Sequence, residues 1–163
     1  MSSANTDDGT IGRLGADLTL VQMLDLLPLG ACVIDRDRVV HAWNTTLASW
    51  SSVPREDILG TRLTDRYAHL ETWCFRERLN QVFGGGTPAV FSAAFHRCFI
   101  PARPPQCPAV DQMIQQTIVR PIDDSLTKAL VIIQDVTAQY LQMVELRGRR
   151  ITPAAACPSA GLC

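Results

Sequence analysis

The sequence lacks both a membrane-spanning run and a secretion signal. No segment approaches the roughly 18 consecutive apolar residues that a transmembrane helix needs. The first residues, MSSANTDDGTIGR, contain neither the basic start nor the apolar stretch of a secretory signal. We therefore expect a cytoplasmic protein with no membrane span.

An excess of positive charge is missing as well. The 163 residues include 15 Lys and Arg against 16 Asp and Glu, which gives a formal net charge of −1. Proteins that bind nucleic acid normally carry a basic surplus, because neutralising phosphates supplies most of their affinity. We therefore expect no nucleic-acid partner.

Paired metal ligands and catalytic motifs are also lacking. The six cysteines contain no CxxC pair and the three histidines are widely spread, so the sequence indicates neither a metal site nor a disulfide scaffold. Reduced thiols are the expected state of the cysteines. Because no GxSxG, P-loop or HExxH motif occurs, we expect no enzymatic activity and no catalytic residues.

The sequence does contain enough apolar residues for a single core, since 47% of the chain is hydrophobic and 19% is charged. Leu20, Met23, Leu24 and Leu27 recur at helical spacing and predict one apolar helix face. Residues 32–34 and 39–43 then predict two short strands, joined by a tight turn at Asp35 to Arg38.

The middle of the chain predicts helices. Residues 45–70 form a broken helical stretch, in which Thr45 or Thr46 caps one turn and Pro54 begins another. A longer helix is expected from about Leu70 to Phe83, where Gly84, Gly85 and Gly86 end it. Its expected inward side chains are Phe75, Leu79 and Val82.

The second half predicts strands at residues 89–100, 115–122 and 129–136, which are rich in Val, Ile and Phe. The proline-rich stretch PARPPQCPAVD predicts a protruding loop before the second of them. After Asp135 the pattern turns helical again, with a stripe of Tyr140, Leu141 and Val144.

This order of elements predicts an α+β fold, in which a five-stranded antiparallel sheet carries helices on one face and is flanked by a helix at each end. We expect four parts: a disordered lead-in over 1–16, a folded domain over 17–137, an output or linker helix over 138–151 and a disordered tail over 152–163.

Several short motifs, taken in order, resemble a PAS domain. DLLPLGACVIDRDRVVHAWN is similar to the helix and hairpin that open such modules, and SSVPREDILG is similar to the acidic helix that follows. TIVRPIDDS and ALVIIQDVTAQ resemble the last two strands and the Asp-Val-Thr junction with an output helix. FHRCFIPARPP followed by QQTIVRPI resembles the variant that precedes bacterial diguanylate cyclases or histidine kinases.

The resemblance implies a sensory, signal-transducing module of the two-component type that binds a small ligand or a partner and dimerises through its flanking helices. We expect the output kinase or cyclase module to be absent from this chain. The apolar face of the first helix is the natural dimer surface, because a helix of about ten residues is marginal alone in water.

The junction between the last strand and the exit helix is the expected hinge of such a module. The side chain of Asp135 or Thr137 is expected to accept a hydrogen bond from the free amides at the helix start. The same pair would then act as both helix cap and signalling hinge.

Candidate ligand contacts lie near the start of the long helix, which walls the cleft in this family. They are His69, Trp73 and Cys74, although the axial histidine of haem-binding relatives would fall near Trp73 or Cys74. A haem-binding gas or redox sensor therefore stays an alternative, as does a ligand-free dimerisation module. The asparagine-cysteine-arginine signature of photoreactive flavin modules is missing around Cys74.

Two cysteine-based interpretations remain beside the sensor. Cys74 or Cys98 could act as an enzyme nucleophile next to a histidine. His96 and Cys98, two apart on an expected strand, would share one face and supply half of a metal site, although no second pair completes it.

Overall fold

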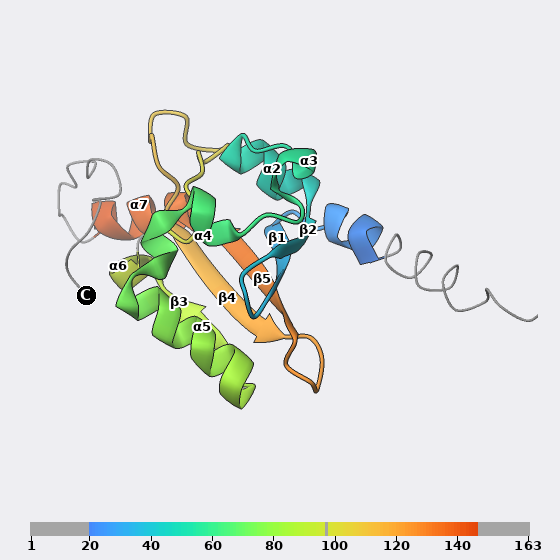
Figure 1. The fold of residues 1–163 in the computed structure, drawn as a ribbon. Helices are drawn as coiled ribbons and strands as arrows, with labels where there is room; N and C mark the ends of the chain where they lie inside the picture. Colours follow the sequence, from blue (N-terminus) through green and yellow to red (C-terminus); the bar gives the residue numbers. More distant parts are fainter. Residues whose placement is uncertain (1–19, 97, 147–163) are drawn as a thin grey trace, which may run out of the picture.

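The computed structural model describes residues 20–96 and 98–146, which form one antiparallel sheet with helices packed against one face (Figure 1). The order of the strands across the sheet is β2-β1-β5-β4-β3. The predicted five-stranded α+β architecture is therefore confirmed. The bounds of the strands are β1 (Gly30–Asp35), β2 (Val40–Trp43), β3 (Ala89–Phe91), β4 (Gln115–Pro121) and β5 (Lys128–Asp135).

The predicted lead-in and tail, together with the arginines that follow the exit helix, lie outside the described residues. Among the residues that are described, no helix combines the length and the apolar character that crossing a bilayer requires.

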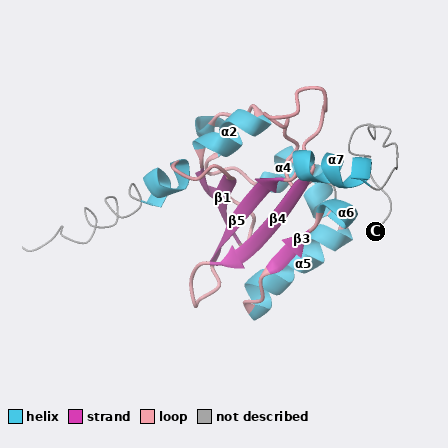
Figure 2. Ribbon diagram, turned by 180° about the vertical axis from the view of Figure 1, so that it is seen from behind, coloured by secondary structure: helices cyan, strands magenta, loops and turns pink. Residues whose placement is uncertain are grey.

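Strand β5 lies at the centre of the sheet and is hydrogen-bonded on both edges. It pairs with β1 from Gly30↔Ile133 to Asp35↔Lys128, and with β4 along its opposite edge. Alternate side chains of β4 and β5, including Val119, Val131 and Ile133, are fully buried beneath the helices. Seen from behind, β4 and β5 lie in front of the covering helices (Figure 2).

The helical layer is built from short pieces, as the broken pattern of residues 45–70 predicts. They are α2 (Thr45–Ser51), α3 (Arg55–Ile58), α4 (Leu63–Arg66), the 3₁₀ turn η1 (Ala68–Glu71) and the longer α5 (Trp73–Gly85). Helix α5 contacts β3, β4 and β5 and buries the predicted side chains of Phe75, Leu79 and Val82.

The long helix begins three residues later than predicted. Leu70 belongs to η1, whose amides bond to the third residue before them: Leu70 N to Tyr67 O at 3.0 Å and Thr72 N to His69 O at 3.1 Å. Thr72 is extended, with ψ at 150°, and so separates the two elements. At the other end Gly86 closes α5 in a left-handed conformation with φ at 67°.

The prediction of one long strand over residues 89–100 is wrong. Only Ala89–Phe91 is strand, and α6 (Ala93–His96) follows it. The carbonyl oxygen of Ser92 accepts hydrogen bonds from the amides of Phe95 and His96, which begins a helical turn. His96 and Cys98 therefore do not share one face of a strand, and the half metal site proposed from their spacing is incorrect.

The first helix packs on the opposite face of the sheet. Residues 20–25 are helical, and Leu24 forms a small second core with Ala31, Val33 and Ala42. Asp25, at the end of this helix, accepts two hydrogen bonds from the guanidinium of Arg55 on α3, at 2.6 and 2.8 Å.

Asn44 connects the first helix, the β1–β2 hairpin and α2. Its side-chain oxygen accepts from the amides of Ala31 and Leu47, both at 2.9 Å, and its nitrogen donates to the carbonyls of Leu24 and Leu29. Asn44 is completely buried and is the N-cap of α2. The expectation that Thr45 or Thr46 caps this helix is therefore wrong.

We predict that Asn44→Ala lowers the free energy of unfolding by about 3 kcal/mol, because it leaves two buried amides and two carbonyls without their partner. Urea unfolding followed by circular dichroism measures this change. The matched control is Asn80→Ala on α5, an exposed asparagine, which should alter the free energy by less than about 0.5 kcal/mol. Equal effects of the two variants would contradict the assignment.

Candidate functional site

The space between α5 and the sheet, where the predicted cleft lies, is filled with aromatic rings. Phe75 of α5 stacks on Phe91 of β3 with ring centroids 5.2 Å apart. Phe99 packs edge-on against both rings, at 6.0 and 5.2 Å. Since aromatic rings fill it, this cleft is a packed core rather than an open chamber.

His69 lies at the margin of this aromatic cluster, on η1. Its ring is edge-on to Phe75, with centroids 5.6 Å apart, and its Nε2 is 3.0 Å from the carbonyl oxygen of Phe99. Burial lowers the pKa of His69 below that of a free imidazole, and the bond to Phe99 opposes this shift only in part. Of the three predicted cleft candidates, His69 contacts the cluster most directly.

His96 approaches the same rings from α6, which the sequence did not indicate. Its ring lies 5.2 Å from Phe91 and 5.6 Å from Phe75. Burial, reinforced by the positive charge of Arg78, lowers the pKa of His96. The fold therefore places two imidazoles with lowered pKa values against Phe75.

The other two candidates lie at the first turn of α5. Trp73 is 67% exposed and so contributes little to the cleft. Cys74 is half-buried beside it and is disulfide-bonded, so the expectation of reduced thiols is wrong for this residue. The structure thus separates the three candidates, because the 3₁₀ turn places His69 before the helix rather than on it.

One polar group inside the buried layer stands out. The side chain of Thr117 on β4 is 1% exposed, and within the described part of the chain its hydroxyl oxygen has no hydrogen-bond partner. Thr117 lies directly across from Phe91 on β3 and from Ile133 on β5. A hydroxyl buried without a partner costs about 1–3 kcal/mol, so this position favours an additional group that bonds to it.

A second polar side chain, Gln115, is buried and fully engaged. Its oxygen accepts from the amides of Phe99 and Ile100, and its nitrogen donates to the carbonyl of Ile100. This clamp holds the loop after α6 against β4. The prediction omitted it, although Gln115 alternates with Thr117 and Val119 and the two-residue period of a strand places all three on one face.

The predicted hinge residues meet at the start of α7 (Thr137–Leu146), which follows β5 after the single residue Val136. A carboxylate oxygen of Asp135 accepts from the amide of Thr137 at 2.9 Å. The hydroxyl oxygen of Thr137 is fully buried and accepts instead from the amide of Ile114, also at 2.9 Å. The pair thus links the exit helix to the end of the long loop.

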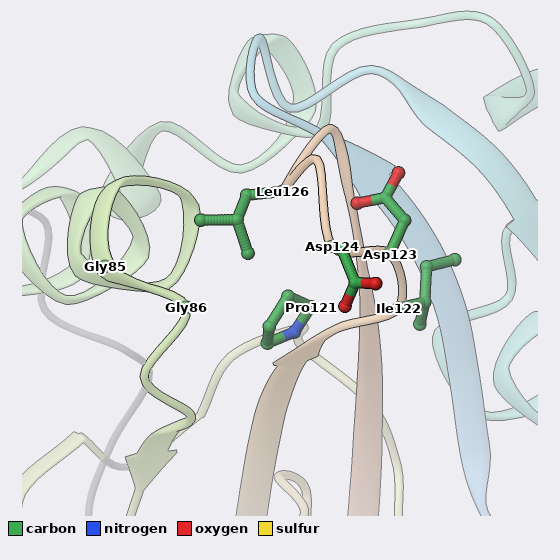
Figure 3. A pocket seen from close by; sticks show the side chains of 7 residues that line it. All are labelled: Gly85, Gly86, Pro121, Ile122, Asp123, Asp124 and Leu126. Atoms are coloured by element: carbon green, nitrogen blue, oxygen red, sulfur yellow. The ribbon is translucent and has the colours of Figure 1, made fainter.

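An open hollow of about 720 Å³ lies away from the cleft, between the end of α5 and the β4–β5 turn. Figure 3 shows Leu126 of this turn pointing at Gly85 and Gly86. Arg36 holds the turn by donating to the carbonyl oxygens of Leu126 and Ser125. The Asp123 carboxylate accepts hydrogen bonds from the amide and the hydroxyl of Thr127. The contacts around the hollow therefore hold the tip of the β4–β5 hairpin in place.

Among residues 20–96 and 98–146, no group of three or more His, Cys, Asp or Glu side chains is arranged to hold a metal ion. Cys32 is fully buried, and its burial raises the pKa of the thiol, which makes it a poor nucleophile.

Comparison with known proteins gives the family. The family model described as the PAS fold matches residues 24–141, which is most of the chain. This chain belongs to the PAS family. No curated protein matches it.

Solved structures similar to this PAS domain are sensor domains. A sensory box sensor histidine kinase from Vibrio cholerae has a TM-score of 0.54 at 17% identity, covering 79% of this chain and 98% of that one. The photoactive yellow protein domain of the sensor histidine kinase Ppr from Rhodospirillum centenum has a TM-score of 0.51 at 20% identity, covering 71% and 92%. A sensory box histidine kinase/response regulator domain from Geobacter sulfurreducens has 0.53 at 15%, covering 75% and 96%. At these identities the likeness concerns the fold.

The residues present do not fit a haem in this PAS domain. A macrocycle would need the space between α5 and the sheet, which the rings of Phe75, Phe91 and Phe99 occupy. Of the two imidazoles beside these rings, His69 directs Nε2 at the carbonyl of Phe99, and His96 packs edge-on against Phe75 and Phe91. We therefore derive no chemistry through haem.

We predict that His69 and His96 both titrate below the pKa of about 6.5 that an unfolded histidine shows. Because the folded pKa is the lower one, their contribution to stability is present above that value and is lost as the pH falls toward the folded pKa. Imidazole NMR titration of native and urea-unfolded protein measures both pKa values. The free energy of unfolding of His69→Gln should fall less between about pH 7 and about pH 5 than that of the parent. A native pKa above the unfolded one would refute the packing argument.

Proposed function

We propose that this PAS domain is a sensory module that binds a small ligand and transmits its state through α7. The observation that carries the proposal is that β5, the central strand of the sheet, continues into α7 after one residue. A shift of the sheet therefore displaces the start of the exit helix.

The input is proposed to be a small, uncoloured molecule that enters the aromatic cluster and bonds to the Thr117 hydroxyl. Support comes from that hydroxyl, which is buried among apolar neighbours and has no partner in the described part of the chain. The rings of Phe75, Phe91 and Phe99 must rotate to admit a ligand. The second candidate function, a ligand-free dimerisation module, is favoured by the same close packing.

The output is proposed to pass through a homodimer. The helical residues 20–25 are anchored to the domain by Leu24 and by the ion pair between Asp25 and Arg55, yet Leu20 and Met23 are 43% and 60% exposed. Apolar side chains held on a fixed helix form a surface that a second copy can cover.

Further parts of the proposal rest on the family resemblance. We propose a cytoplasmic module of a two-component or cyclase pathway, whose kinase or cyclase output lies on another polypeptide or segment. The rival cysteine enzyme has less support, because Cys98 is 2% exposed and Cys74 is disulfide-bonded. A single unusually fast cysteine in thiol titration at neutral pH would revive that rival.

We predict that native mass spectrometry of freshly purified protein shows a dimer that retains a non-covalent small molecule. The Thr117→Val variant should lose most of the adduct, because the isosteric change removes the hydroxyl to which the ligand is proposed to bond. Thr87→Val, at an exposed position before β3, is the matched control and should keep it. A wild-type protein free of any adduct would favour the ligand-free module, and absorption near roughly 400 nm would favour haem.

We predict that Met23→Glu raises the dimer dissociation constant by about tenfold or more, because a carboxylate would be buried in the interface. Sedimentation analysis over a range of concentrations measures the constant. Gln22→Glu introduces the same charge on the same helix at an exposed position and should raise the constant less. A monomeric parent protein, or equal effects of the two variants, would remove the proposed surface.

A further inference from the structure

The segment between α6 and β4, residues 98–114, contacts the aromatic cluster, α2 and the start of α7. We name it the strap. Figure 1 shows its outer part as a loop that projects beside α7 and α2, while its two limbs are buried at Cys98, Phe99, Ile100, Ala102 and Met113. A surface loop seldom buries both of its limbs.

At the cleft, the strap contributes a ring and a carbonyl group. The Phe99 ring packs against Phe75 and Phe91, and the Phe99 carbonyl oxygen meets Nε2 of His69. A ligand that displaces the Phe99 ring therefore acts directly on this end of the strap.

At the output helix, the strap ends in two hydrogen bonds made by the backbone of Ile114. The amide of Ile114 donates to the hydroxyl of Thr137, and the carbonyl of Ile114 accepts from the amide of Val136, both at 2.9 Å. These bonds hold the two residues that connect β5 to the body of α7.

Between its ends, the strap is stiff and internally tied. The amide of Met113 donates to the carbonyl of Ala102 at 2.8 Å, which joins the two limbs. The amide of Arg103 donates to the carbonyl oxygen of Trp50, near the end of α2. Four prolines, at 101, 104, 105 and 108, fix their own backbone φ angles. A stiff element passes on a displacement that a flexible loop would absorb.

The outer part of the strap has room to move. A hollow of about 210 Å³ separates it from the first turn of α7, between Pro105 and Gln106 on one side and Asp135 and Ala138 on the other. The strap is thus fixed at both ends while its middle is loosely packed.

We propose that the strap is a second mechanical link between the aromatic cleft and the exit helix, acting in parallel with β5. Movement of Phe99 is transmitted through the hydrogen bond between the Met113 amide and the Ala102 carbonyl to Ile114. It then changes the hydrogen bond between the Ile114 amide and the Thr137 hydroxyl. The link is a property of the fold, so it is present whether or not the proposed ligand exists, and its test needs no ligand.

Backbone hydrogen exchange under native conditions tests the link from both ends, because coupling between two sites must be reciprocal. Phe99→Leu, at the cleft end, should speed exchange of the Val136 and Tyr140 amides by about tenfold relative to the Ile133 amide in the centre of β5. Phe83→Leu is the matched control, since Phe83 is buried in the same core on the last turns of α5, and it should leave that ratio unchanged.

From the output end, Thr137→Val should speed exchange of the Phe99 and Arg103 amides by about fivefold or more, in addition to that of Ile114. Thr127→Val, the same change at the opposite end of β5, is its control. The link is overturned if Thr137→Val affects only Ile114, or if Phe99→Leu leaves the Val136 and Tyr140 ratios at their parent values. Should Phe99→Leu fail to fold, the Thr137→Val result decides.

Discussion

The constraint on which the rest of this structure depends is the position of β5. Because it is hydrogen-bonded along both edges, its register fixes which side chains of β1 and β4 face the helical layer. A slip of one residue would turn Val131 and Ile133 toward the outer face and bring Lys128 and Gln134 toward the core. The same strand leads into α7, so the element that organises the core also sets the position of the exit helix.

Much of the fold follows from patterns that are local in the sequence. The β1–β2 hairpin, the buried side of α5 and strands β4 and β5 each follow from periodicity and turn residues, and the structure contains them as predicted. The errors arise where a long-range contact overrides a local preference. Residues 92–100 have strand-like composition, but Gln115 holds the Phe99 and Ile100 amides, so they need no strand partner. Asn44 is preferred to Thr45 as the cap because its amide reaches four backbone groups from three elements.

The candidate site was less accessible to prediction than the fold. A family resemblance directs attention to α5, but the side chains that meet in the cleft come from η1, α5, β3, α6 and the strap. Trp73 was a reasonable candidate by its place in the chain, yet the helix turns it toward solvent. Thr117 and Gln115 could have been placed inside by the two-residue period of β4. Which of them lacks a partner depends on the course of the strap, and that course has no local signature.

The close packing of the aromatic cluster affects how a change in the cleft could reach α7. A cleft already filled by side chains resists a ligand, so binding must displace rings that were well packed. The ligand's higher affinity for the opened state must supply the free energy of that displacement. Phe99 is the ring whose backbone leaves the core toward α7, whereas Phe75 and Phe91 are held within regular elements. Displacing Phe99 therefore requires the least rearrangement of the sheet and the most of the strap. On this argument a filled cleft is compatible with sensing, and the strap determines how much of the opening of the cleft is transmitted to the exit helix.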